Sequence, residues 1–269
     1  MYFYKTVKTA KYFLIPLLFV VFSFRQDKPA RLVVKAKFDY FTVDNIGNMY
    51  LVNEDELLKY LPSGKFFARY SNLKLGRITS VDATNPLKIL LYYRDFQQIV
   101  YIDDQLTPNA ESISLEALGY EQTDLACAGA NNSFWIYNKQ NNELIRFNEL
   151  SKKVTATGNL KQVLRTDISP NFMIERNNFL YLNSPETGIY VFDVFGTFSK
   201  VISLKNLKAY QVYDDIVYYQ RDSSFCSYNF KYFEEACKAL PGVTKVVSSE
   251  FYKGKVYTAF KDSLVVGGI

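Results

Sequence analysis

The sequence predicts an all-β fold, a six-bladed β-propeller, and three observations lead to it. A pair of short apolar segments recurs along the 269 residues at a period of roughly 40, the repeat length of a four-stranded propeller blade. The segments are rich in Tyr, Phe, Ile, Val and Leu, which favour strands, and aromatic residues make up 17% of the chain. Long stretches with the periodicity of helices are few.

The second segment of each pair can be aligned by eye across six copies. Its copies begin at Leu57, Ile99, Leu144, Ile189, Phe225 and, with a weaker match, Leu264. A strand-like run precedes each copy, and these runs cover residues 49–52, 89–93, 134–137, 179–182, 216–219 and 256–260. Turn-forming residues such as Asn131-Asn132 and Asp214-Asp215 separate the runs. Six copies predict six blades. The composition of residues 233–240 does not decide between a helical turn and a strand.

The last copy lacks a fourth strand. It has room for strands near residues 245–249, 256–260 and 263–266, and no fourth run follows them. Residues 32–37, Leu-Val-Val-Lys-Ala-Lys, are a strand-like run that belongs to no other blade. Because a free sheet edge is a liability, we predict that residues 32–37 form the outer strand of the last blade. Residues 32–269 are then a single propeller domain.

The N-terminus predicts export. Lys5, Lys8 and Lys11 precede an apolar run at residues 12–24, which is shorter than the roughly 18 residues of a spanning helix. A basic segment before a short apolar core is typical of a secretory signal peptide. We expect residues 1–24 to be a signal peptide, with an uncleaved membrane anchor as the alternative. The predicted location is the periplasm or the outer membrane, and membrane contact occurs through this segment if it is uncleaved.

The chain has three cysteines, and two of them are close in sequence. Cys226 and Cys237 could close a hairpin-sized loop in an exporting compartment, whereas Cys127 has the surroundings of a buried core residue. The alternative is three buried thiols. The chain contains no Cys-x-x-Cys, so neither a thioredoxin-type site nor a zinc ribbon is indicated.

The composition excludes several kinds of chemistry. The chain contains no His, which removes Ser-His-Asp and Cys-His nucleophilic systems and His-liganded zinc. It has no P-loop and no dinucleotide-binding glycine pattern. The net charge is +5, but Lys and Arg are scattered, so no nucleic-acid partner is expected. What remains is carboxylate chemistry or an oxygen-ligand site for calcium or magnesium.

Candidate carboxylates follow an apolar residue or a threonine in four copies of the repeat. They are Asp44, Asp82, Asp124 and Asp167. In a propeller these residues would lie at the ends of the innermost strands, near the central channel, where their oxygens could hold a cation such as calcium. The simpler interpretation is that each aspartate caps a turn by accepting backbone N–H bonds. No other cofactor is expected.

The segment Asp193-Val194-Phe195-Gly196 is a candidate partner-contact loop. It should be the hairpin between the two outer strands of the fourth blade, with Gly196 in the tight turn. Phe195 would then be exposed, and exposed apolar groups can mark a partner surface. The alternative is that Phe195 folds back onto the neighbouring blade. Trp135 lies within a strand-like run and is expected in the core.

The first repeat resembles the NHL-type repeat of six-bladed propellers. The matching residues are Val43-Asp44, the run Gly47-Asn48-Met49-Tyr50-Leu51-Val52, Leu58-Lys59-Tyr60 and Gly64-Lys65. Later copies depart from this pattern, because Ser133 and Asn178 stand where Asn48 does. The whole chain is also similar to the TolB-like group of exported bacterial propellers.

The resemblance implies a ring fold and often a binding role. Related metal-dependent lyases use His ligands, which this chain lacks. Lactone hydrolases of this kind use Glu, Asn and Asp around a divalent ion, and no such set can be matched residue by residue in this chain.

Three functional hypotheses follow. The first is a non-catalytic interaction scaffold of the bacterial cell envelope, whose partner is another envelope protein or complex. The second is an exported carboxylate- or metal-dependent hydrolase or lyase acting on sugars or lactones, which requires carboxylates clustered at one channel mouth. The third is a carbohydrate-binding module, which requires aromatic faces lining a groove. Missing motifs favour the first, because the site and not the fold determines function.

Overall fold

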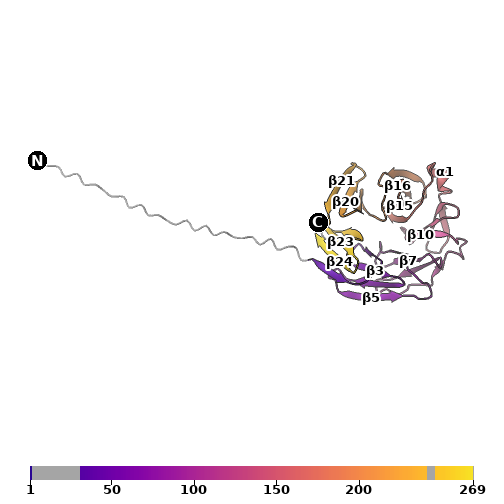
Figure 1. The fold of residues 1–269 in the computed structure, drawn as a ribbon. Helices are drawn as coiled ribbons and strands as arrows, with labels where there is room; N and C mark the ends of the chain where they lie inside the picture. The colour runs from indigo at the N-terminus through magenta and orange to yellow at the C-terminus, as the bar shows by residue number, and fades with distance from the viewer. Residues whose placement is uncertain (2–30, 241–245, 269) are drawn as a thin grey trace. The chain divides into compact units, whose positions relative to one another are not determined.

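The protein is a six-bladed β-propeller, as the sequence predicts. The computed structural model describes Met1, residues 31–240 and residues 246–268. Residues 31–240 and 246–268 contain six four-stranded antiparallel sheets that follow one another around a centre (Figure 1). The described residues contain one short α-helix, α1 (Leu160–Leu164), in the connection between the third and fourth sheets.

Each blade is a meander whose strands are neighbours in chain order. Blade 1 contains β2 (Tyr40–Val43), β3 (Met49–Asn53), β4 (Glu56–Tyr60) and β5 (Phe66–Ser71). Blade 2 contains β6 (Ser80–Asp82), β7 (Ile89–Tyr93), β8 (Gln98–Ile102) and β9 (Ile113–Ser114). Blade 3 contains β10 (Thr123–Ala128), β11 (Phe134–Asn138), β12 (Glu143–Phe147) and β13 (Lys153–Ala156).

The second half of the ring repeats this arrangement. Blade 4 contains β14 (Phe172–Arg176), β15 (Phe179–Ser184), β16 (Gly188–Asp193) and β17 (Phe198–Ile202). Blade 5 contains β18 (Gln211–Tyr213), β19 (Ile216–Arg221), β20 (Ser224–Asn229) and β21 (Glu234–Ala239). Blade 6 contains β22 (Ser248–Tyr252), β23 (Lys255–Phe260), β24 (Ser263–Gly268) and, from the start of the ring, β1 (Leu32–Lys35).

The aligned segments are the second and third strands of the blades. Several boundaries differ by a few residues: the first strand of blade 6 begins at Ser248 and not at residue 245, which lies outside the described residues, and the predicted strand at residues 32–37 ends at Lys35. The apolar pair Val246-Val247 suggested an earlier start, but it precedes the strand, and Val247 is exposed. The undecided residues 233–240 include the strand β21.

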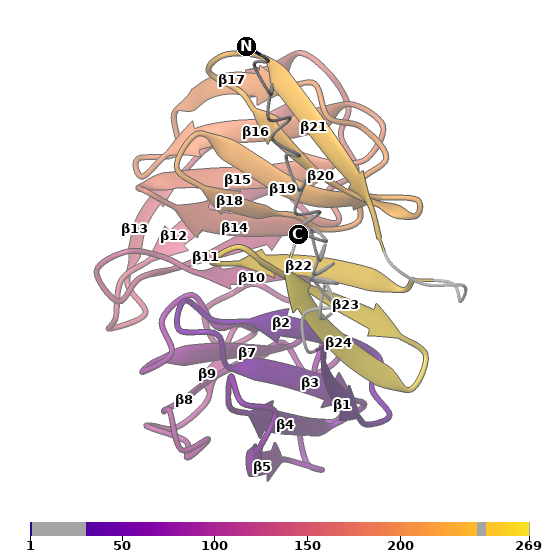
Figure 2. The same cartoon turned by 90° about the vertical axis from the view of Figure 1, so that its left-hand side faces the viewer.

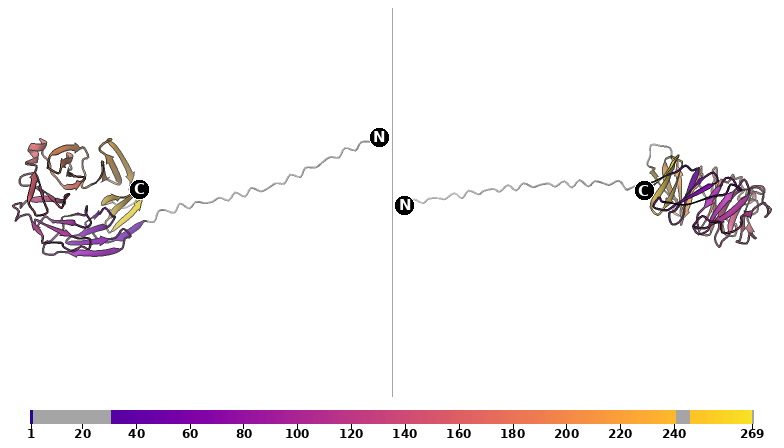
Figure 3. Two further views of the ribbon diagram at one scale, coloured as in Figure 1. Left: turned by 180° about the vertical axis from the view of Figure 1, so that it is seen from behind. Right: turned by 90° about the horizontal axis from the view of Figure 1, so that it is seen from below.

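The N-terminal strand closes the ring. β1 pairs antiparallel with β24, and its register runs from Leu32 opposite Val266 to Lys35 opposite Ser263. The two strands lie side by side in Figure 2, and the view from behind in Figure 3 shows the indigo first strand beside the yellow last blade. Leu32 also covers the turn of blade 1 at Gly64, where an added Cβ would lie 2.6 Å from Leu32 Cδ1. The predicted closure is confirmed.

The core lies between successive blades. Five clusters of buried apolar side chains each join two neighbouring blades, and blades 5 and 6 meet through stacked aromatic rings. The rings of Tyr218 and Phe251, for example, stack with centroids 4.4 Å apart. Trp135 is fully buried in the cluster of blades 3 and 4, as expected for a core residue. The high aromatic content therefore fills the wedges between blades.

Alternating strand directions divide the turns between two faces. The turns between the first and second strands of every blade, and between the third and fourth strands of blades 1 to 5, lie on one face, which we call face 1. The turns between the second and third strands and the connections between blades lie on the other, which we call face 2. For example, Arg146 in β12 of blade 3 donates to the carbonyl of Val194 in the outer turn of blade 4, which lies on face 1.

Two sequence expectations concern the ends of the chain and its cysteines. Cys226 and Cys237 occupy facing positions on β20 and β21 and are joined by a disulfide, whereas Cys127 is a buried free thiol.

The predicted signal peptide at residues 1–24 lies outside the described residues, apart from Met1. In the part of the chain that the structure describes, no helix has the length and apolar character to cross a membrane.

Candidate functional site

The candidate aspartate in blade 1 caps a turn. The Asp44 carboxylate is buried, and its Oδ1 accepts hydrogen bonds from the backbone N–H groups of Ile46 and Asn48, at 3.0 and 2.9 Å. Its Oδ2 accepts from the Asn48 side-chain amide at 2.7 Å and from the Tyr50 hydroxyl at 3.0 Å. Burial, followed by the charge of Asp44, raises the pKa of Tyr50. Both carboxylate oxygens therefore have donors within the blade.

The other three aspartates lie at different places in the fold. Asp82 ends β6, where its Oδ2 accepts from the backbone N–H of Ala128 in blade 3 at 3.0 Å. Asp124 is the second residue of β10 and forms an ion pair with Lys139, at 3.2 Å. Asp167 follows α1, is exposed and pairs with Lys161 at 2.9 Å.

The structure therefore does not bring the four aspartates to one mouth of the channel. Because first strands run from face 2 to face 1, Asp44 and Asp82 lie toward face 1 and Asp124 and Asp167 toward face 2. Among residues 31–240 and 246–268, no three Asp, Glu, Cys or His side chains are grouped as metal ligands would be.

Side chains of the innermost strands instead join the blades to one another. Glu250 accepts from the N–H of Val43 at 2.8 Å, which joins blade 6 to blade 1. Gln211 accepts from the N–H of Phe251 at 2.5 Å, and joins blade 5 to blade 6. Asp82 joins blade 2 to blade 3 in the same manner. Each of these acceptors receives the N–H of a residue on the first strand of the next blade. We call these three residues the inter-blade acceptors.

The inter-blade acceptors occupy one register position, which sequence reading missed. Each acceptor lies on the first strand of its blade, opposite a residue of the second strand: Asp82 faces Leu90, Gln211 faces Tyr218 and Glu250 faces Tyr257. Each of these second-strand residues pairs, on its other side, with the third residue of the aligned segment. The signal is hidden because the turn that intervenes varies in length, from residues 83–88 in blade 2 to Lys253 and Gly254 in blade 6.

Glu250 is the most strongly perturbed carboxylate. Its Oε2 accepts from Val43 N–H at 2.8 Å, from the Gln211 amide at 3.1 Å and from the Thr42 hydroxyl at 3.4 Å. Burial raises the pKa of Glu250 to about 8, although these backbone and hydroxyl donors and the Arg176 guanidinium act in the opposite direction. Burial thus favours the protonated form of Glu250 at the seam where the ring closes.

A pocket of about 460 Å³, lined mostly by residues with polar or charged side chains, opens on face 1. Its walls are the first turns of blades 2, 3 and 4, which contribute residues 84–85, 129–133 and 177–178. Arg176, Lys88 and Tyr101 also line it. Arg176 crosses from blade 4 to donate to the Thr84 hydroxyl of blade 2. Lys88 lies over the Tyr101 ring, 4.8 Å from its centroid. The pocket is within the range of about 300–1,000 Å³ usual for small-molecule sites.

The predicted contact loop of blade 4 has an exposed aromatic side chain. Asp193 Oδ1 accepts from the N–H groups of Phe195 and Thr197, both at 2.8 Å, and Gly196 adopts a φ of 79°. The Phe195 carbonyl accepts a hydrogen bond from Thr155 in blade 3 at 2.8 Å, while its side chain is 72% exposed. The loop backbone is therefore held in place, and the ring of Phe195 points into solvent.

Other large apolar side chains are exposed on the same face. Turns and adjoining strand ends on face 1 expose Ile46, Phe66, Phe67, Leu87, Leu150, Phe179, Phe195, Tyr232 and Phe233. Loops and turns on face 2 expose fewer of them, namely Leu73, Phe96 and Val247, together with Val163 in α1. Blades 1 to 5 all contribute to face 1. More of the exposed large apolar residues therefore lie on face 1, which also contains the pocket, than on face 2.

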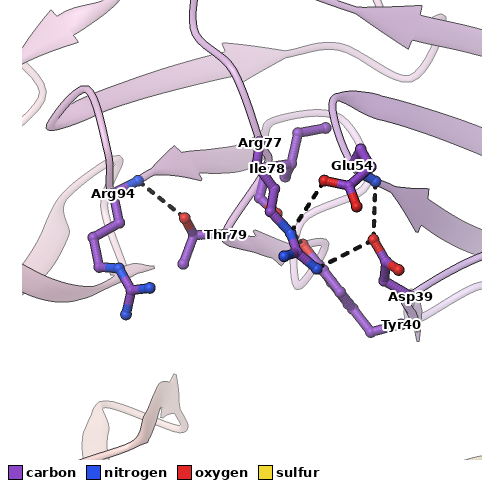
Figure 4. A network of polar contacts seen from close by, with 7 residues as sticks. All are labelled: Asp39, Tyr40, Glu54, Arg77, Ile78, Thr79 and Arg94. Carbon is purple, nitrogen blue, oxygen red and sulfur yellow. Dashed lines mark hydrogen bonds and ion pairs between the residues drawn. The ribbon is translucent and has the colours of Figure 1, made fainter.

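The main charged network on face 2 is structural. Arg77, in the connection between blades 1 and 2, pairs with Asp39 at 3.3 Å and with Glu54 at 3.7 Å, and Asp39 also accepts from the Glu54 N–H (Figure 4). These exposed ion pairs each contribute under about 1 kcal/mol. Because every carboxylate in this network has a partner in the connection it holds, the network fixes loops and offers no free group for chemistry.

The described residues thus define a six-bladed propeller, with a pocket and most of its exposed apolar side chains on face 1. No protein-family model and no curated protein sequence matches the chain. Solved structures do match the chain. The WD40 domain of Neurospora crassa Pan2 is similar with a TM-score of 0.59 and 8% identity over 87% of this chain and 89% of that chain.

Two further solved structures belong to proteins of other kinds. Virginiamycin B lyase from Staphylococcus aureus gives a TM-score of 0.58 at 13% identity over 85% of this chain and 79% of its own. The BBS1N domain in complex with ARL6DN gives 0.51 at 10% identity, covering 81% of this chain and 74% of that one. At such low identity these likenesses establish the propeller fold alone.

Proposed function

We propose that the protein is a non-catalytic interaction scaffold of the bacterial cell envelope, of the NHL- or TolB-like type, that docks another envelope protein on face 1. The observation that carries the proposal is the concentration of exposed large apolar side chains on that face, from Ile46 in blade 1 to Phe233 in blade 5. Exposed apolar residues that gather on one face can mark an interaction surface. Phe195 and Phe233, at 72% and 78% exposure, are the anchors we expect.

The chemistry of the channel supports a binding role. Carboxylates that a hydrolase would use are bonded to backbone N–H groups, as for Asp82 with Ala128 and Glu175 with Ala130. Buried polar groups that have partners stabilise a fold. Their positions are therefore explained by the joining of blades, without a substrate.

One observation favours the second hypothesis, an exported hydrolase or lyase acting on sugars or lactones. Glu250 has a pKa of about 8, near the value that suits a general acid at neutral pH. Its Oε2 already accepts three hydrogen bonds from Val43, Gln211 and Thr42. The scaffold hypothesis accounts for the same group as the acceptor that joins blade 6 to blade 1, and we prefer it for that reason.

Site-specific photocrosslinking in the native host tests the scaffold. A crosslinking phenylalanine analogue is placed at Phe195 or Phe233 on face 1, and at Leu73 or Val247 on face 2 as matched exposed positions. We expect a discrete adduct with a single envelope protein from the face 1 positions only, and recovery in the membrane or periplasmic fraction. Adducts of equal yield from both faces, or none from face 1, would contradict the proposal.

A further inference from the structure

We infer that the pocket on face 1 between blades 2, 3 and 4 binds an acidic saccharide, a sugar that carries a carboxylate. This ligand goes beyond the proposed protein docking, because most residues that line the pocket have polar or charged side chains, whereas the anchors expected for a protein are the exposed aromatic side chains. The pocket holds about 460 Å³, which is room for a ligand of several rings and not only for an ion.

The pocket walls present amide groups that the protein leaves unused. Asn131, Asn132, Asn177 and Asn178 adopt φ values of 57°, 58°, 51° and 62°. The left-handed backbone of these turns explains why asparagine stands there. This backbone conformation does not require a hydrogen bond from the asparagine side chain. The side chains of Asn131, Asn177 and Asn178 form no hydrogen bond with any described residue. Each free amide can donate to and accept from a sugar hydroxyl.

The floor of the pocket carries a guanidinium group without a carboxylate partner. Arg176 donates through Nη1 to the Thr84 hydroxyl and to the Glu175 carbonyl at 2.9 Å. Within residues 31–240 and 246–268, no carboxylate lies within ion-pair distance of Arg176, and its Nε and Nη2 have no acceptor. An arginine that lines a pocket and keeps two donor nitrogens free of protein acceptors is suited to a bidentate carboxylate.

The remaining charges in the lining also favour an acceptor-rich ligand. Glu175 is the only carboxylate among the residues that line the pocket, and its two oxygens already accept from Ala130 N–H at 2.7 Å and from the Trp135 indole at 2.6 Å. Lys88 adds a second cation, shared with Glu149 at 3.4 Å. Donors therefore outnumber free acceptors, which matches an anion with hydroxyl groups.

The spread of these groups distinguishes a saccharide from a simple anion. Arg176 alone would satisfy a phosphate or carboxylate ion. The free amides lie on the turns of two different blades, Asn131 on blade 3 and the pair Asn177 and Asn178 on blade 4. A ligand that meets both turns as well as Arg176 needs hydroxyls distributed over more than one ring.

Calorimetric titration of the full chain with trigalacturonic acid tests the assignment. Maltotriose serves as the neutral ligand of the same length, and inorganic phosphate as the bare anion. We expect saturable binding of trigalacturonic acid, with maltotriose and phosphate at least about tenfold weaker, since a hydrogen bond to a charged group accounts for a factor of roughly 10 to 100. Arg176→Gln should weaken trigalacturonic acid by a similar factor.

A second variant keeps the test independent of folding effects. Replacing Asn177 and Asn178 by Gly retains a backbone that tolerates positive φ and removes only the amides, so binding should weaken several-fold without loss of the fold. Asn206→Gly, at a φ of 61° on face 2, is the matched control and should bind as the wild type does. Thermal melts verify that all variants fold.

Three outcomes would overturn the assignment. The first is the absence of saturable trigalacturonic acid binding at about 1 mM ligand. The second is phosphate or maltotriose binding as tightly as trigalacturonic acid, which would leave a simple anion site or a neutral sugar site. The third is equal binding by the wild type and by the Asn177→Gly, Asn178→Gly double variant. Crosslinking at Phe195 would be unaffected by any of these results, so the two proposals fail separately.

Discussion

Ring closure by β1 can be tested with two adjacent valines. Val34 and Val33 lie in the same strand, opposite Leu264 and Val265 of β24, but Val34 is 4% exposed and Val33 is 49% exposed. Replacing Val34 by Ala removes two buried carbon atoms, or about 1.6 kcal/mol of transfer free energy. Incomplete collapse of the cavity raises the expected loss to about 2–3 kcal/mol.

The exposed neighbour serves as the control for strand propensity. Val33→Ala loses the same intrinsic preference for strand, which is under about 1 kcal/mol, and little burial. In a domain of this size each kcal/mol corresponds to about 2–4 °C in Tm. Scanning calorimetry should therefore show Tm falling by about 4–12 °C for Val34→Ala and by no more than about 4 °C for Val33→Ala.

The comparison refutes the closure if the two variants lose the same Tm or if Val33→Ala loses more. Equal losses would mean that β1 does not pair with β24 in the register that places Val34 opposite Leu264. A large loss confined to Val34 cannot come from strand propensity, because the two positions share residue type, strand and partner strand.

Three further predictions concern the seam, the turns and the disulfide. Glu250 has a pKa of about 8 in the fold, above its usual 4.5, so its contribution to stability is fully present below about pH 4.5 and is lost as the pH rises through 8. Since one pKa unit is about 1.4 kcal/mol, denaturation at pH 5, 7 and 9 should show the free energy of unfolding decline by a few kcal/mol. Glu250→Gln should abolish this decline, and an equal decline in the variant would contradict the prediction. Ser151→Gly should gain and Gly196→Ser lose about 1 kcal/mol in urea denaturation, because both positions have positive φ; a change of the same sign in both would be inconsistent with the turns. Cys226→Ser with Cys237→Ser should cost about 2–3 kcal/mol relative to the oxidised protein, and identical melts in oxidising and reducing buffer would disprove a stabilising cross-link.

The interior strands of each blade were predictable because they are apolar on both sides. Every residue of β7 is buried, since the second strand packs against two neighbouring blades, and such a strand gives a continuous apolar run. The outer strand β21 gives no such signal, because all six of its residues are exposed. Its sequence, Glu-Glu-Ala-Cys-Lys-Ala, is compatible with helix, and pairing with β20 decides the conformation.

The site was less predictable than the fold. The blade 4 hairpin could be located, since Asp193 and Gly196 have direct conformational roles in a turn. The pocket could not, because Arg176 and Thr84 meet across the ring from blades 4 and 2. A contact between residues so far apart in sequence depends on the closed ring, so no local sequence pattern predicts it.

The joining of the blades accounts for several acidic and amide side chains near the channel. The innermost strand of each blade has an outer neighbour only on one side, so the N–H groups on its inner edge need acceptors. Asp82, Gln211 and Glu250 supply them from the adjacent blade. Acidic and amide side chains near the channel are therefore needed as hydrogen-bond acceptors that join the blades. Polar groups without a partner in the protein are better evidence of a ligand, and among the described residues of the face 1 pocket these include the buried Tyr101 hydroxyl, Nε and Nη2 of Arg176, and the exposed amides of Asn131, Asn177 and Asn178.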